Sequence, residues 1–201
     1  MLPGMMHEQF NKTGQQLARF AFFWLALAAL WIIYAPNAAS AQSGAQSNKP
    51  QATFKNWRLY VETDGANKQC FIVGEPNSSR PRNVRRGNIF LTIAHRPGQG
   101  VRNEVSVRIG YPFSEDSNPF ARIGSDTFRF FTGVTAKTGA AEWAWLESLT
   151  DQPRMVTAMK RGNELVFKGT SKRGTLTTDS YSLLGVTAAM RALDAACPAS
   201  K

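Results

Sequence analysis

The sequence predicts a mainly β domain, folded as an antiparallel β-sandwich or an open barrel, with two helices of which one is C-terminal. Stretches in which apolar and polar residues alternate, the pattern of half-buried strands, recur along the chain from residue 56. The segments between them contain Gly, Pro, Asn and Ser, the residues of turns. Only two segments show helical spacing instead, which is typical of a β fold that helices cover in part.

The first 41 residues have the composition of a secretory signal peptide. Lys12 and Arg19 precede an uncharged apolar run, FAFFWLALAALWIIYA at 20–35, and an A-x-A site follows at 39–41. We expect cleavage between Ala41 and Gln42. The weaker alternative is an uncleaved anchor, because a bilayer span needs roughly 20 apolar residues and this run is shorter. Both interpretations carry the rest of the chain across the inner membrane, and cleavage would make the protein periplasmic or secreted.

The mature chain is predicted to begin with a flexible linker and to continue as one β domain. Residues 42–52, QSGAQSNKPQA, are polar and include Gly, Ser and Pro, so they form the linker. The domain then covers residues 53–201. Strands are expected at 56–63, 69–75, 88–95, 103–113, 126–133 and 141–148, and two more are expected within 163–183.

Two segments have the signals of helices. The first is DQPRMVTAMKRG at 151–162, with Asp151 as a candidate cap and Gly162 just past the helix end. The second begins after Gly185 and cannot continue through Pro198. Its apolar residues fall at i, i+4, i+7 and i+11 on one face, and they are Val186, Met190, Leu193 and Cys197.

The chain contains two cysteines, Cys70 and Cys197. In an oxidising compartment an even number of cysteines predicts disulfide bonding, so we expect these two to pair. The chain-entropy model assigns such a long closed loop about 5 kcal/mol as an upper figure. The alternative, a reactive or metal-binding pair, is disfavoured because the sequence has no C-x-x-C spacing and no histidine close to either cysteine.

The charge balance favours an anionic partner. The chain has 24 Lys and Arg against 14 Asp and Glu, a formal net charge of +10. We predict an anion- or partner-binding site in the densest basic stretch, at Arg80, Arg82, Arg85 and Arg86. Envelope phosphates or anionic lipid would suit it, with peripheral membrane association. A nucleic acid partner is not expected for an exported protein. The plainer alternative is a solvated loop between strands.

The sequence gives little sign of catalysis. His95, the one histidine after the predicted signal, lacks a nucleophile-elbow context, and no cofactor or metal site is expected from one histidine and two distant cysteines. Trp143 and Trp145 project from the same sheet face. They could stack on a sugar ring, but aromatic residues at alternate strand positions favour the core. A glycan-cleaving enzyme with two carboxylates remains the alternative.

Several motifs resemble the invasion-associated locus B family, a family of exported proteins of alphaproteobacteria. They are GYPF (110–113), FRFFT (128–132), AMKRG (158–162), GTSKRGT (169–175) and DSYSLLGVTAAM (179–190), with the late Cys197. The resemblance covers Trp57 to Cys197. It implies no established catalytic residues, and in some members a link to entry into host cells.

We therefore predict an exported, non-catalytic cell-envelope protein that binds a protein or an anionic envelope component. The resemblance adds a link to host-cell interaction. The alternatives are a periplasmic enzyme acting on cell-wall glycan and a purely structural or stress-related periplasmic protein.

Overall fold

The computed structural model describes residues 49–65 and 67–199. The predicted signal segment, its cleavage site at Ala41 and Gln42, and linker residues 42–48 lie outside the described residues. The described part contains a 3-10 turn, η1 (Pro97–Gln99), and two α-helices, α2 (Asp151–Arg161) and α3 (Val186–Ala196). The strands are β1 (Ala52–Phe54), β2 (Trp57–Asp64), β3 (Asn67–Gly74), β4 (Ser78–Arg80), β5 (Phe90–Arg96), β6 (Val101–Arg108), β7 (Phe120–Ile123), β8 (Asp126–Thr132), β9 (Trp143–Leu146), β10 (Glu164–Thr170) and β11 (Leu176–Ser182).

The strands form one antiparallel sheet in the order β1-β2-β3-β5-β6-β9-β8-β7-β10-β11-β4. β1 and β4 each have one neighbour, so the sheet is open rather than a closed barrel. Strand β8 belongs to two halves of this sheet: residues 126–129 pair with β7, and residues 130–132 pair with β9. We call β1, β2, β3, β5, β6 and β9 the first half, and β8, β7, β10, β11 and β4 the second half. The predicted class, mainly β with two helices, is confirmed.

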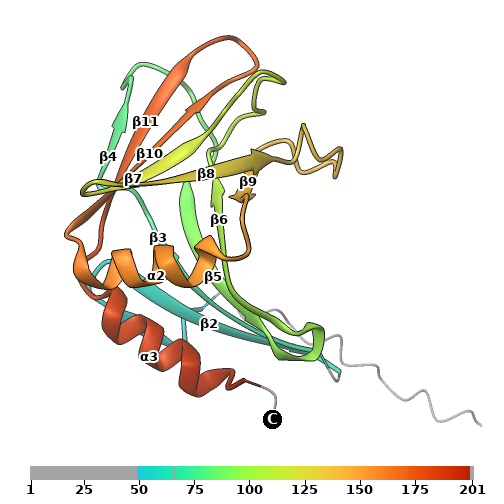
Figure 1. The fold of residues 1–201 in the computed structure, drawn as a ribbon, viewed down its shortest axis with the longest axis vertical. Coiled ribbons are helices and arrows are strands. Elements are labelled where there is room, and N and C mark those ends of the chain that lie inside the picture. Colours follow the sequence, from blue (N-terminus) through green and yellow to red (C-terminus); the bar gives the residue numbers. More distant parts are fainter. Residues whose placement is uncertain (1–48, 66, 200–201) are drawn as a thin grey trace, which may run out of the picture. The chain divides into compact units, whose positions relative to one another are not determined.

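The core lies between the inner faces of the two halves and the helices (Figure 1). Helix α3 packs against β2 and β3, and α2 packs against β6 and β8. The predicted apolar stripe of α3 is fully buried, with each member at most 1% exposed. Fully burying one such aliphatic side chain stabilises the fold by roughly 1.5–3 kcal/mol, so the stripe fixes which face of α3 meets the sheet.

Two glycines determine how the helices are placed. Gly185, which precedes α3, has φ +97°, and a Cβ there would lie 2.1 Å from the carbonyl oxygen of Phe54 in β1. Gly162 ends α2 at the predicted position, but its backbone is extended, with φ −86°. It is needed for space instead, because a Cβ would lie 2.7 Å from Ile123. Asp151 makes no side-chain capping bond and instead forms an ion pair with Arg154.

Three short strands were not predicted: β1, β4 and β7. Each has three or four residues. That length is too short to display a period of two, so only pairing with a longer neighbour makes these segments strands. β1 begins at Ala52, the last residue of the predicted linker, and pairs with β2. β4 pairs with β11 and carries Arg80, which places this residue at an edge of the second half.

Candidate functional site

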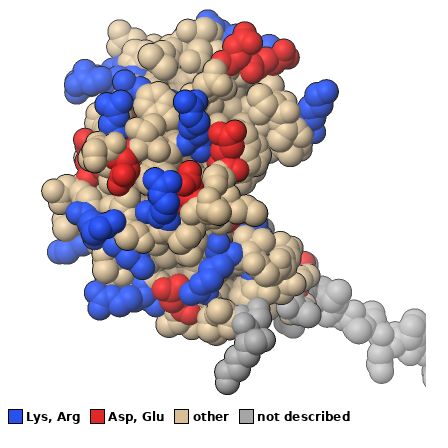
Figure 2. All heavy atoms as spheres, in the orientation of Figure 1, with Lys and Arg blue, Asp and Glu red and all other residues tan. Residues whose placement is uncertain are grey.

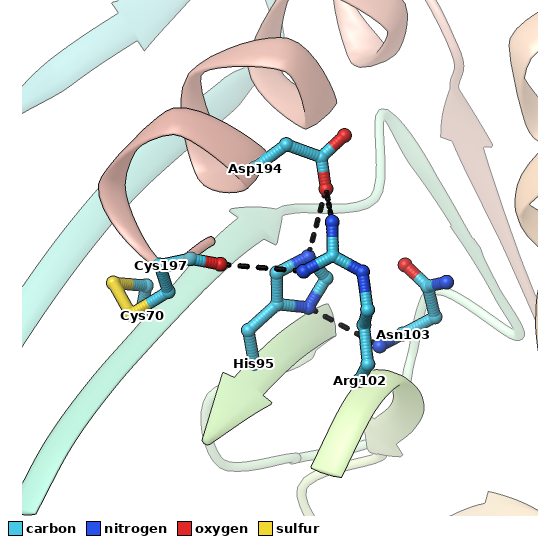
Figure 3. The surroundings of a disulfide bond; sticks show 6 residues. All are labelled: Cys70, His95, Arg102, Asn103, Asp194 and Cys197. Atoms are coloured by element: carbon cyan, nitrogen blue, oxygen red, sulfur yellow. Dashed lines mark hydrogen bonds and ion pairs between the residues drawn. A yellow bond between two sulfur atoms is a disulfide. The ribbon is translucent and has the colours of Figure 1, made fainter. Parts of the chain in front are cut away.

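The predicted disulfide between Cys70 and Cys197 is present. The S–S distance is 2.06 Å, the Cα atoms are 6.0 Å apart, and both residues are fully buried. Cys70 lies on β3 and Cys197 directly follows α3, so the bond ties the helix to the sheet (Figure 3). The alternative of a reactive or metal-binding pair is therefore set aside.

Three polar side chains converge beside this disulfide (Figure 3). One carboxylate oxygen of Asp194 lies 3.0 Å from Nε2 of His95 and 2.5 Å from the guanidinium of Arg102. Nδ1 of His95 accepts the backbone N–H of Asn103 at 3.1 Å, so Nε2 is the nitrogen that donates to Asp194. Both ring nitrogens are thus engaged, and His95 is only 1% exposed. This histidine has a structural role, because neither nitrogen is available to take a proton from a nucleophile.

Arg86 lies inside the domain and not on its surface. Its guanidinium donates two parallel hydrogen bonds of 2.7 Å to Asp179, and the two side chains are 5% and 0% exposed. Nε donates to the carbonyl oxygen of Ile109 at 2.9 Å, and the guanidinium sits 5.0 Å from the ring centre of Tyr111. The prediction that Arg86 belongs to an anion-binding surface is therefore wrong, because its charge is already bound to an internal carboxylate.

Tyr181 lies near this pair, and its hydroxyl has no hydrogen-bond partner among the described residues. Burial raises the pKa of Tyr181 well above its usual value, and the charge of Asp179 raises it further. A pKa that is higher in the folded than in the unfolded state stabilises the fold below the unfolded value, about 10. That stability is lost as the pH rises through the folded-state pKa.

We expect Tyr181→Phe to unfold with at least the wild-type free energy at pH 7, because an unpaired buried hydroxyl is itself destabilising by about 1–3 kcal/mol. Above about pH 10 the wild type should lose up to about 1.4 kcal/mol per pH unit through this residue, and the variant should lose less. Urea titrations of both proteins at neutral and alkaline pH measure the difference. Parallel alkaline losses in the two proteins would contradict this assignment.

Arg80, Arg82 and Arg85 are exposed, and Arg80 belongs to a wider basic surface. The cross-strand register aligns one outward row over all five strands of the second half. The row consists of Arg80, Thr178, Lys168, Phe120 and Arg129. Arg122 lies in the next row. We call Arg80, Lys168, Arg122 and Arg129 the basic face.

None of the four cations of the basic face has an acidic partner in the described part of the chain. The ion pairs found there involve other arginines and His95. Lys and Arg are also the more numerous charged residues in the view of Figure 2. A hollow of about 550 Å³ lies at Arg122 and Arg129, and Phe131, Thr127 and Glu147 also line it. This surface can attract anions because its charges are not neutralised within the fold.

The first half carries a different surface on its outward face. Trp143 and Trp145 are partly exposed and stack on each other with ring centres 6.2 Å apart, whereas Ala144 and Leu146 point into the core. The sequence favoured the core for both tryptophans, and that prediction is wrong. They line a hollow of about 1020 Å³. We call it the aromatic groove, and Figure 2 shows the molecule indented on this side.

The two surfaces differ in their acidic residues: the aromatic groove is lined by three glutamates, Glu62, Glu75 and Glu104, and the hollow of the basic face by one, Glu147. No group of three or more His, Cys, Asp or Glu residues that could hold a metal occurs among residues 49–65 and 67–199. Two groove carboxylates, Glu75 and Glu104, pair with Arg58 and Arg96. Within the same residues, no helix is long and apolar enough to span a bilayer.

The fold and its surfaces define a class of protein. It is a disulfide-linked antiparallel β domain, with the basic face and the aromatic groove on the outward faces of its sheet. The chain belongs to the Invasion associated locus B (IalB) protein family, because the model of that family matches residues 57–194. The resemblance seen in the sequence is therefore confirmed.

A solved structure supports the fold. The crystal structure of invasion associated protein B from Bartonella henselae aligns with a TM-score of 0.50 at 14% sequence identity, over 72% of this chain and 95% of that chain. A search of curated proteins finds no match. Neither the family nor this neighbour bears the name of an enzyme.

Proposed function

We propose that the chain is an exported, non-catalytic protein of the cell envelope that binds a phosphate-bearing membrane surface through its basic face. In this proposal residues 1–41 are removed and the domain works in the periplasm or outside the cell. The row of unpaired cations across the second half carries the proposal. The disulfide supports export, because such bonds persist in oxidising compartments.

The arrangement of the cations favours a surface over a small ligand. Neighbouring strands lie about 4.8 Å apart, so a row over five strands extends about 19 Å. No single phosphate reaches both Arg80 and Arg129 at that spacing, whereas a lipid bilayer offers several head groups at once. Each basic residue near an anionic membrane contributes about 1 kcal/mol, so four give about 4 kcal/mol, a dissociation constant of about 1 mM in accessible lipid. Arg82 and Arg85, exposed beside Arg80 in the chain, would add to this attraction.

Vesicle sedimentation tests the proposal with the mature chain. We expect binding to phosphatidylglycerol vesicles but not to phosphatidylcholine vesicles, and we expect high salt to release the protein because exposed charges are screened. Serine at Arg80, Lys168, Arg122 and Arg129 should weaken binding at least tenfold.

The matched control removes the same amount of charge elsewhere, with serine at four exposed cations on β3, α2 and α3. They are Lys68, Lys160, Arg161 and Arg191. This control should bind within about twofold of the wild type. Equal loss in both variants would show that only net charge matters, and equal binding to both lipids would refute the proposal. If the envelope partner is a protein instead, the chain will not sediment with vesicles. Cross-linking to that partner in intact cells will still depend on the basic face.

A further inference from the structure

The aromatic groove lies on the first half of the sheet, and the proposed membrane contact does not use it. One wall is a cross-strand pair, Tyr60 on β2 and Phe71 on β3, stacked with ring centres 5.3 Å apart and an interplanar angle of 12°. The other wall is formed by Trp143 and Trp145 on β9. Strands β5 and β6 lie between β3 and β9, so the walls stand about 14 Å apart. A gap of this width is too wide for a single flat ring to stack on both walls, so a ligand that contacts both must be a chain of several rings.

Two phenylalanines pack against the wall formed by Trp143 and Trp145. Phe90 meets Trp143 edge to face at 5.4 Å, and Phe131 stacks on Trp145 at 5.7 Å. Aromatic contacts of this kind are favourable beyond the area they bury. The tryptophans are therefore held in place before any ligand arrives, which reduces the entropy lost on binding.

The floor of the groove is polar. Thr92 on β5 and Ser106 on β6 are cross-strand neighbours whose hydroxyl oxygens lie 2.6 Å apart. Both residues are less than 9% exposed. Their mutual hydrogen bond uses one hydroxyl proton, so the pair can still donate one proton and accept further hydrogen bonds. A hydrocarbon chain would cover these groups without satisfying them, which is unfavourable. A ligand with hydroxyl groups of its own fits this floor better.

The charges of the groove disfavour an anionic ligand. Its lining includes two arginines and three glutamates, Arg58, Arg96, Glu62, Glu75 and Glu104. Both arginines are paired, Arg58 with Glu75 and Arg96 with Glu104. The groove therefore offers no spare positive charge, in contrast to the basic face.

We propose that the aromatic groove is a binding site for an uncharged glycan chain. A sugar ring has an apolar C–H face that stacks on an aromatic ring, and a rim of hydroxyl groups that exchange hydrogen bonds with polar side chains. Stacked tryptophans beside a hydroxyl floor match both features, and the paired arginines and glutamates can hydrogen-bond hydroxyls at the margin. No bond is broken in this proposal, because the site binds and does not cleave.

The site is tested by titrating the mature chain with three neutral hexasaccharides. They are cellohexaose, maltohexaose and N-acetylchitohexaose. We expect at least one to shift the tryptophan fluorescence and to bind saturably by calorimetry. Trp145→Ala should weaken that binding at least tenfold. Because loss of a tryptophan can disturb the sheet, the second variant is Thr92→Val with Ser106→Ala, which keeps the shape of the floor and should weaken binding at least fivefold.

Two controls separate this site from the membrane contact. Phe120→Ala removes an aromatic ring from the second half and should leave glycan affinity within twofold. The floor variant should still sediment with phosphatidylglycerol vesicles, and the four-serine variant of the basic face should still bind the glycan. The proposal is overturned if none of the three hexasaccharides binds, if the floor variant binds the glycan as tightly as the wild type, or if a fatty acid displaces the glycan with higher affinity.

Discussion

Replacing Asp179 with alanine is expected to lower the free energy of unfolding by about 3–5 kcal/mol. The change leaves the Arg86 guanidinium 5% exposed and without its carboxylate. Its remaining contacts, the Ile109 carbonyl and the Tyr111 ring, carry no full negative charge. Urea denaturation followed by circular dichroism measures the loss.

Two further variants make this prediction specific. Asp151→Ala breaks an ion pair in which the Arg154 side chain is 61% exposed, so we expect a loss of at most about 1 kcal/mol. The double variant Arg86→Met with Asp179→Leu removes both charges and should recover most of the stability lost in Asp179→Ala. Similar losses for Asp179→Ala and Asp151→Ala would mean that the buried Arg86–Asp179 pair matters no more to stability than an exposed ion pair.

Removing the disulfide is the second change with a large expected effect. Cys70→Ala with Cys197→Ala should lower the free energy of unfolding by about 2–5 kcal/mol, chiefly because the unfolded chain regains the freedom that the long closed loop denies it. Hydrogen exchange should accelerate most in α3, whose end the bond fixes to β3.

Reduction of the wild type provides the matched comparison. The reduced protein should unfold at the same urea concentration as the double variant, and alkylation should change the intact mass only after reduction. If the oxidised and reduced proteins unfold at the same urea concentration, the disulfide does not contribute the stability assigned to it. Alkylation of the cysteines without reductant would show that the bond is not formed.

The long elements could be predicted because each displays its own period. The α3 stripe that includes Met190 and Leu193 indicates both a helix and its buried face, and the strand pattern at 56–63 indicates β2. The disulfide followed from counting cysteines and from the expected compartment. The family resemblance followed from short motifs that lie in or beside these long elements.

The sequence could not show which face of the sheet is exposed. It also could not show which distant residue pairs with a given side chain. Alternation places Trp143 and Trp145 on one face, but only the packing of Ala144 and Leu146 shows that this face is the outer one. Arg86 stands among exposed arginines in the sequence, yet its carboxylate partner lies 93 residues away. No local pattern distinguishes it from Arg85.

The basic face could not be predicted for a related reason: its residues lie far apart in the sequence. Adjacent arginines in the chain suggested one patch, whereas the unpaired cations that share a surface come from four different strands. Arg80, Lys168 and Arg129 are neighbours only through the registers of β4, β11, β10, β7 and β8. A weak sequence signal existed, since Arg129 lies between the buried Phe128 and Phe130, and Lys168 follows the buried Phe167.

The Cys70–Cys197 bond makes the chain between them a covalent ring, with a sequence separation of 127. Every cation of the basic face and both groove tryptophans belong to that ring, whereas β1, β2 and the start of β3 lie on the segment before it. A protease that cuts one exposed loop, such as the β10–β11 turn at 172–174, would therefore open the ring without releasing a fragment. The nicked protein would migrate as one band without reductant and as two with it. Both proposed binding surfaces would remain on a single molecule.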